Sequence, residues 1–173
     1  MKITSLLPAM TSADVRAALT GLPRARGYRL TVVPLRYRSL PHLAAFTSFE
    51  GRSITLQIPE PFLPFREIIH YGAKRAPGKG MKFIPLGKRL TFRSRPEVAR
   101  FLYCHEWYHW YLYEVLKRAS SAETACDRFA LNNFRKAIVT MQDARDALRR
   151  VGWRQGFQKN LRLARTNGSA KTK

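Results

Sequence analysis

The chain has 173 residues, 45% of them hydrophobic and 12% aromatic, which excludes an intrinsically disordered chain and suffices for one domain with a hydrophobic core. Its 32 lysines and arginines outnumber its 11 aspartates and glutamates, so the net charge is +21. Such a charge attracts polyanions, DNA or RNA, although a charge excess that only aids solubility or is neutralised by another partner is an open alternative.

The first third of the chain predicts one short helix followed by strands. A helix is expected within 11–23, because capping residues precede it and glycine and proline end it. Residues 28–37 predict a strand rich in β-branched and aromatic residues, and Pro34 suggests that it is an edge strand or carries a bulge. Residues 43–59 predict a β-hairpin with a tight turn at Glu50 and Gly51.

The middle of the chain is less regular. Residues 65–71 fit either a strand or a helical turn, and the glycines and proline of 72–80 predict a loop. Residues 81–92 predict a second hairpin that turns around Pro85 to Gly87.

Positive charge is densest between Gly72 and Arg95, where there are eight basic residues and no acidic one. Seven of them are the first candidates for a nucleic-acid contact, and they are Lys74, Arg75, Lys79, Lys82, Lys88, Arg89 and Arg93. A solvated loop and strand face is an equally open interpretation.

Three helices are predicted in the last half, each from a capping pattern. They begin at Ser94, Ser120 and Thr140 and end near Lys117, Ile138 and Gly152. We expect residues 1–165 to form a single α+β domain, with a small antiparallel or mixed sheet, and 166–173 to be a disordered basic tail.

The most informative motif is His105-Glu106-Trp107-Tyr108-His109, an HExxH within the first of these helices. Residues four apart share one helix face, so His105 and His109 can bind one Zn²⁺. Glu106 then lies beside the metal and can take a proton from a zinc-bound water, as a catalytic base does. The alternative is two partly buried histidines that stack with neighbouring aromatic rings.

A third metal ligand is expected in the next helix, where Glu123 and Asp127 are also four residues apart. One can bind the metal while the other orients a ligand histidine. If the HExxH helix runs unbroken to Lys117, Glu123 begins the return roughly 12 Å beyond His109 and Asp127 lies nearer the metal. Without a metal, Glu123 is a helix-capping residue and Asp127 forms a surface ion pair.

"HEWYH" followed by "ETACDRFA" resembles the gluzincin arrangement of zincin metallopeptidases, and residues 42–135 are similar to ImmA/IrrE-type and SprT-like proteins. The resemblance implies a zincin-like fold, with Zn²⁺ bound by His105, His109 and Glu123 and with Glu106 as the general base. Asp127 matches the polar residue that supports a ligand histidine or replaces Glu123. The gap between His109 and Glu123 is shorter than is usual for gluzincins and approaches the SprT-like spacing.

Other parts of such a site are less defined by the sequence. An oxyanion donor could be His70 or one of five tyrosines, which are Tyr71, Tyr103, Tyr108, Tyr111 and Tyr113. The edge strand that aligns a peptide is expected within 81–93. Cys104 and Cys126 are expected to be buried structural thiols and form no disulfide framework.

Two functions follow from these observations. The first is a zinc metallopeptidase that cleaves a protein or peptide near nucleic acid or bound to it. The second is a basic nucleic-acid-binding module whose metal is structural or absent. The apolar run within 1–10 is too short for a signal peptide and no stretch fits a membrane span, so we expect a cytoplasmic protein that has no contact with membranes.

Overall fold

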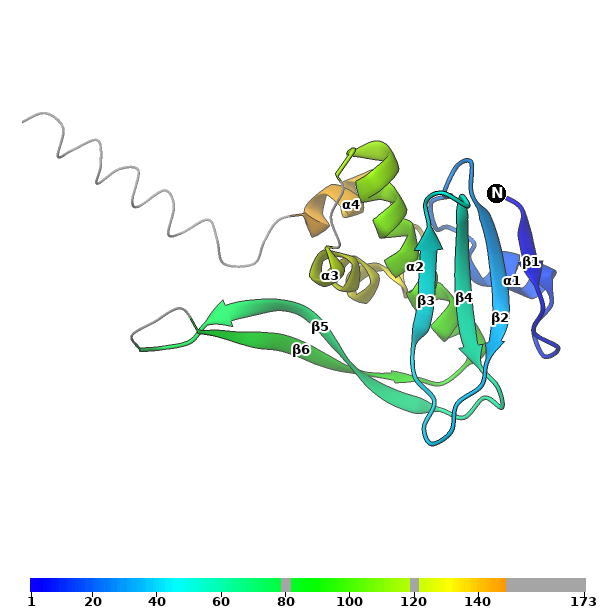
Figure 1. Ribbon diagram of the computed structural model, residues 1–173, viewed down its shortest axis with the longest axis horizontal. Coiled ribbons are helices and arrows are strands. Elements are labelled where there is room, and N and C mark those ends of the chain that lie inside the picture. The colour runs from blue at the N-terminus through cyan, green and yellow to red at the C-terminus, as the bar shows by residue number, and fades with distance from the viewer. Residues whose placement is uncertain (79–81, 119–121, 149–173) are drawn as a thin grey trace, which may run out of the picture.

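The fold is described here from a computed structural model, for residues 1–78, 82–118 and 122–148. It is a mixed α+β structure with a four-stranded sheet, a separate two-stranded hairpin and, within these residues, four α-helices (Figure 1). No helix in this part of the chain is both long and apolar enough to span a membrane. The predicted tail, 166–173, lies outside the described residues.

The four-stranded sheet contains β1 (Ile3–Ser5), β2 (Arg29–Leu35), β3 (Ala44–Ser48) and β4 (Ser53–Pro59), in the order β1-β2-β4-β3. The predicted hairpin is confirmed, because β3 and β4 pair in antiparallel register. The sheet is nevertheless mixed, since β1 with β2 and β2 with β4 are parallel. Alternate apolar residues of the two central strands are fully buried, and they are Leu30, Val32, Ile54, Leu56 and Ile58.

Pro34 lies in an internal strand, so the edge position predicted for β2 is wrong. The reason it is tolerated there is the shortness of β1, which pairs only with Leu30 to Val32. The amide of Leu30 donates to the carbonyl of Lys2, on the β1 side of β2. Pro34 lies four residues after Leu30, so its backbone nitrogen faces the same side of β2. The N–H that proline lacks would therefore point past the end of β1, where no ladder bond is lost.

The helix α2 (Arg95–Trp110) lies between the sheet and α3 (Glu123–Asn133), while α1 (Ser12–Ala18) and α4 (Met141–Ala147) complete the helical layer (Figure 1). The predicted starts of α1, α2 and α4 are confirmed, with Thr11, Ser94 and Thr140 as N-caps. The third helix ends at Asn133 rather than near Ile138. Its predicted cap, Ser120, and the predicted end of α4 near Gly152 lie outside the described residues.

Aromatic side chains around α2 form the centre of the core. Trp107 and Tyr108, the two middle residues of the HExxH motif, are fully buried and pack on Phe129 of α3 with ring centroids 5.2 and 4.7 Å apart. The hydroxyl of Tyr108 donates to the carbonyl of Ala144 at 2.8 Å and so joins α2 to α4. Because α2 is covered on several sides, its motif is held by packing and not only by helix propensity.

The segment 65–92 differs from the sequence-based expectation. Strands β5 (Phe65–Arg75) and β6 (Phe83–Phe92) form one long antiparallel hairpin, with a register shift between His70 and Gly72. The predicted loop at 72–80 is strand as far as Arg75, and the predicted turn at Pro85 to Gly87 is wrong because these residues lie within β6. A two-stranded ribbon has an edge on each strand, so it tolerates Pro85. A Cβ at Gly87 would lie 2.8 Å from Ile68 Cγ2, so a larger residue there would displace the exposed Ile68 side chain.

Candidate metal centre

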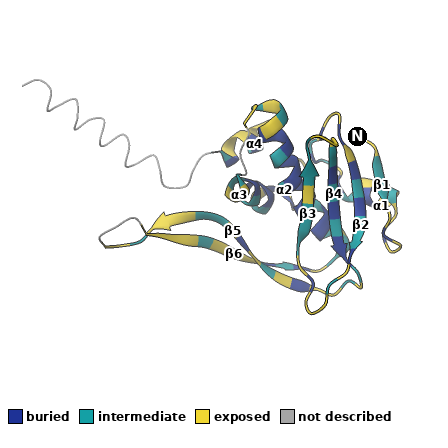
Figure 2. Cartoon of the chain, in the orientation of Figure 1, coloured by how far each residue is buried: buried dark blue, intermediate teal, exposed yellow. Residues whose placement is uncertain are grey.

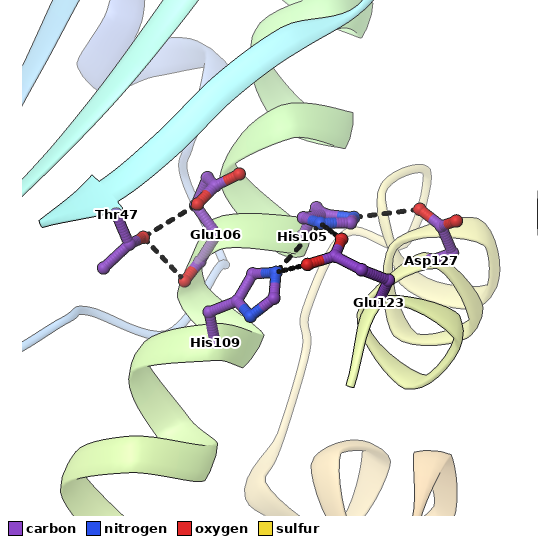
Figure 3. Close-up of polar contacts among 6 residues, drawn as sticks. All are labelled: Thr47, His105, Glu106, His109, Glu123 and Asp127. Carbon is purple, nitrogen blue, oxygen red and sulfur yellow. Dashed lines mark hydrogen bonds and ion pairs between the residues drawn. The ribbon is translucent and has the colours of Figure 1, made fainter. Parts of the chain in front are cut away.

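The two histidines of the HExxH motif face each other across one turn of α2. His105 and His109 have ring centroids 4.9 Å apart, and their Nε2 atoms are 3.1 Å apart (Figure 3). Both are partly buried, whereas the intervening Trp107 and Tyr108 point into the core. The helical period therefore separates a packing face from a face that carries two imidazole nitrogens.

Glu123 completes this group from α3. Its Oε2 atom lies 3.1 Å from His105 Nε2, and its Oε1 atom lies 3.3 Å from His109 Nε2. Tetrahedral zinc with bonds of 2.0–2.1 Å separates its ligand atoms by about 3.3 Å. The donor set of two imidazoles and one carboxylate fits zinc in both chemistry and spacing.

Glu123, rather than Asp127, is the acid that reaches both Nε2 atoms, and α2 ends irregularly before it. After Trp110, α2 continues as a π-helical segment, Tyr111–Val115, and Lys117 then adopts a positive φ of 53°. A π-helical segment widens the last turn, and the positive φ reverses the chain. The helix thus does not continue regularly to Lys117, which was the condition for placing Glu123 about 12 Å away.

Asp127 contacts the other side of the same imidazole. One of its carboxylate oxygens lies 2.9 Å from Nδ1 of His105 (Figure 3). A carboxylate at Nδ1 places the ring proton there and leaves Nε2 as the ligand atom. The two acids of α3 therefore have different positions, Glu123 at the centre of the group and Asp127 behind His105.

The pKa values of the two histidines and Glu123 are shifted, because the histidines are partly buried and the three residues lie close to one another. Burial alone lowers the pKa of His105, but hydrogen bonds to Asp127 and Glu123 and the charge of Glu106 raise it to about 9. Burial and the charge on His105 lower the pKa of His109, and the hydrogen bond from His105 lowers the pKa of Glu123. One proton thus sits among several electron-pair donors, a place that a divalent cation can take instead.

Glu106 is on the side of α2 that faces the sheet and is only 5% exposed. The hydroxyl of Thr47, on β3, donates to Glu106 Oε2 at 2.8 Å (Figure 3). Burial raises the pKa of Glu106, although His105 and Thr47 oppose the shift. A carboxylate with raised proton affinity, held next to the two imidazoles, has the properties of a general base.

A cleft of about 500 Å³ opens at this group. Its walls come from β3, from the end of α2 and the residues after it, and from the first residue of α3. The lining residues that carry chemistry are His105, Glu106, His109, Glu123, Tyr113 and Arg118. The candidate metal ligands therefore lie where a bound molecule can reach them.

Comparisons with models of known protein families, with curated proteins and with solved structures found no match. The function is therefore inferred from the geometry of the site.

Cys126 is a further possible ligand that the sequence reasoning assigned to structure alone. Its Sγ atom and ligand nitrogens of His105 and His109 all lie within 4.8 Å of one another. It is fully buried, and burial together with the nearby Glu123 and Glu106 raises its thiol pKa. The signal in the sequence was its position three residues after Glu123, on the same helix. Cys104 is also buried, as expected, and burial raises its pKa to about 12.

Among the candidate oxyanion donors, Tyr113 lines the cleft. Tyr103 and Tyr108 donate their hydroxyls to backbone carbonyls elsewhere, and Tyr111 is buried. His70 and Tyr71 lie on β5 and do not line the cleft. Arg118, which the sequence analysis did not consider, also lines it and brings a positive charge.

The strand beside the cleft is β3, which contributes Ala45, Phe46 and Thr47 to its lining, and not a strand within 81–93. β3 is the last strand of its sheet and pairs with β4 on one side. The strand expected within 81–93 to align a peptide is β6, which belongs to the separate hairpin and does not line the cleft.

The predicted nucleic-acid-binding residues lie along the β5–β6 hairpin and directly after it. Lys74, Arg75, Lys82, Lys88, Arg89 and Arg93 are all exposed, and Lys79 lies outside the described residues. Arg95 differs from them because it forms an ion pair with Glu60 at 2.9 Å. The basic stretch and the cleft thus belong to different parts of the structure.

Proposed function

We propose that this chain is a zinc-dependent metallopeptidase with a zincin-like arrangement of its sheet and helices. The observation that carries the proposal is the meeting of His105 Nε2, His109 Nε2 and a Glu123 carboxylate within 3.1–3.3 Å, with Glu106 beside them. These three residues would hold the metal, and Asp127 would fix the ring of His105. A bound zinc ion supplies Lewis acidity, which acidifies water and polarises a carbonyl group.

The chain's own residues supply the remaining parts of peptide hydrolysis. Glu106 takes the proton of the attacking water and passes it to the leaving amine. Thr47 holds Oε2 of Glu106 and so orients this carboxylate. Tyr113 and Arg118 line the wall of the cleft and would be the groups that stabilise negative charge on the carbonyl oxygen.

A peptide substrate can be aligned by β3. Within the described residues, β3 pairs with β4 on one side and lines the cleft with three consecutive residues. An extended peptide that adds to such an edge gains backbone hydrogen bonds and would run along the wall of the cleft. The charge of +21 supports a substrate bound to nucleic acid or close to it.

The test combines metal analysis with one isosteric substitution. Purified protein should contain one zinc per chain, and Glu106→Gln should keep the zinc while losing 10²–10⁴-fold in hydrolysis, because the base is removed. Hydrolysis is measured by mass spectrometry on a denatured protein mixture and on a peptide library, each with and without duplex DNA. Glu114→Gln is the matched control, since Glu114 accepts a hydrogen bond from the Tyr28 hydroxyl and lies outside the metal group.

A parent protein that contains no zinc would end the proposal, as would undiminished hydrolysis by Glu106→Gln. The second candidate, a nucleic-acid-binding module with a structural or absent metal, is favoured by the exposed basic hairpin. It predicts that Glu106→Gln leaves every measurable activity of the chain unchanged.

A further inference from the structure

The β5–β6 hairpin projects away from the rest of the described structure (Figure 1). Its base is anchored by Phe65, Ile69, Leu90 and Phe92, which are buried. Beyond this base both strands are largely exposed (Figure 2). Between Ile69 and Leu90, no described residue of the hairpin is buried, so this outer part adds little to the core and leaves two strand edges open to a partner.

The register divides the hairpin into two faces, because side chains opposite each other in an antiparallel pair share a face. One face contains the buried anchors, Lys88, which pairs with the anchor Ile69, and, farther out, Lys74 paired with Ile84. The other face, here called the arginine face, contains Arg66, Ile68 paired with Arg89, and Arg75 paired with Phe83. All five of these residues are exposed, with Ile68 52% and Phe83 57% exposed.

The hairpin carries far more positive than negative charge. Within 65–78 and 82–92 there are six basic residues, Arg66, Lys74, Arg75, Lys82, Lys88 and Arg89, and one acidic residue, Glu67. Glu67 lies on the face opposite the arginines and accepts a hydrogen bond from the Leu43 amide. The arginines of the arginine face take part in none of the ion pairs found among the described residues. Their charge is therefore free for a polyanion.

The shape of the ribbon selects among polyanions. The major groove of B-DNA, about 12 Å wide, admits a two-stranded β-ribbon, whereas the major groove of an RNA duplex is too narrow for side chains to read. From Arg66 to Arg75 the strand spans about 30 Å, which is about nine base pairs. Arginine forks bind phosphates and guanine edges, and Ile68 and Phe83 can contact thymine methyl groups.

We infer that the β5–β6 hairpin is a duplex-DNA-binding arm that contacts DNA through its arginine face. Arg66, outside the basic stretch recognised in the sequence, belongs to this face, while Lys74 and Lys88 do not. The inference goes beyond the proposed peptidase and requires no metal.

Fluorescence anisotropy of a labelled 20-base-pair DNA duplex, measured with the full chain between 50 and 200 mM salt, tests it. The triple substitution Arg66→Gln, Arg75→Gln and Arg89→Gln should weaken binding. It should also reduce the magnitude of the slope of log affinity against log salt by about 2.7, the change expected when three phosphate contacts are lost. Lys74→Gln, Lys82→Gln and Lys88→Gln together remove the same charge and should change that slope by less than about one. An RNA duplex of the same sequence should bind more weakly than the DNA.

Equal losses in the two triple variants would overturn the inference, because they would show attraction by net charge alone. RNA binding as tight as DNA binding would also overturn it. If the arginine variant fails to fold, hydrogen exchange of the unaltered chain decides: DNA should slow exchange in 65–75 and 83–92, and slowing confined to other segments contradicts the proposal. Glu106→Gln should bind DNA like the parent, so failure of the peptidase proposal leaves this test intact.

Discussion

Glu123 and Asp127 are one helical turn apart, yet they contact opposite nitrogens of the His105 ring. Because they are four residues apart, both acids lie on one face of α3. Their spacing alone does not predict which turn of α3 lies opposite His105. The hydrogen bond of Asp127 to Nδ1 leaves Nε2 directed at Glu123 and His109. The role of each acid thus follows from the relative position of two helices.

Substitution by the matching amides should separate these roles. Asp127→Asn should weaken zinc binding by 10–100-fold, the effect typical of a partner that orients a ligand histidine. Glu123→Gln should weaken it more, because a charged ligand is lost. Competition with a chromophoric chelator measures both affinities.

Buried thiols provide the control for this comparison. Cys126→Ser should resemble Cys104→Ser, with less than about tenfold effect, since the proposed donor set contains no sulfur. A large loss in Cys126→Ser alone would identify the thiol as the third ligand, and a larger loss in Asp127→Asn than in Glu123→Gln would reverse the two acids.

At the scale of elements, the segment that follows α1 and the segment that precedes α4 are joined through their backbones. The carbonyl of Gly21, after α1, accepts a hydrogen bond from the Val139 amide, before α4, at 2.9 Å. Gly21 has a φ of 77°, and a Cβ there would lie 1.8 Å from the carbonyl oxygen of Ala137. The backbones of the two segments are thus in direct contact at Gly21, and a side chain at this position would prevent that contact.

Gly21→Ala should therefore lower the free energy of unfolding by more than about 2 kcal/mol, because a left-handed backbone and a backbone clash combine. Gly27→Ala is the matched control, since Gly27 has a φ of 80° and its nearest neighbour would be 3.9 Å from the new Cβ. Its loss should be about 1–2 kcal/mol. Urea denaturation measures both, and equal losses would show that the contact with Ala137 is unimportant.

At the scale of the whole molecule, the metal group joins two helices that are separate in the sequence, so its charge state affects the stability of the whole domain. The pKa of His105 is raised from 6.5 to about 9 in the folded state. Without metal, the charged His105 therefore stabilises the fold fully below pH 6.5, and this contribution is lost as the pH rises to about 9. Zinc has the opposite dependence, because it must displace the same proton.

The increase in Tm on addition of zinc should accordingly grow from pH 6.5 to pH 9. Each pH unit removes one decade of proton competition at His105, equivalent to about 1.4 kcal/mol, or roughly 3–6 °C for a chain of this size. Differential scanning calorimetry at fixed free zinc measures it. His109→Ala should show little increase at any pH, and a zinc effect that falls with rising pH would contradict the assignment.

Local patterns in the sequence were enough to locate the HExxH, the acids that follow it and the caps at Thr11, Ser94 and Thr140, because each depends on residues within about one helical turn. Tertiary structure alone decided the mixed strand order, the single long β5–β6 hairpin and the contact of Thr47 with Glu106. These depend on what distant segments place beside a residue. Pro34 fits an internal strand because β1 ends early, and Glu123 reaches both histidines because α3 packs beside the HExxH turn of α2.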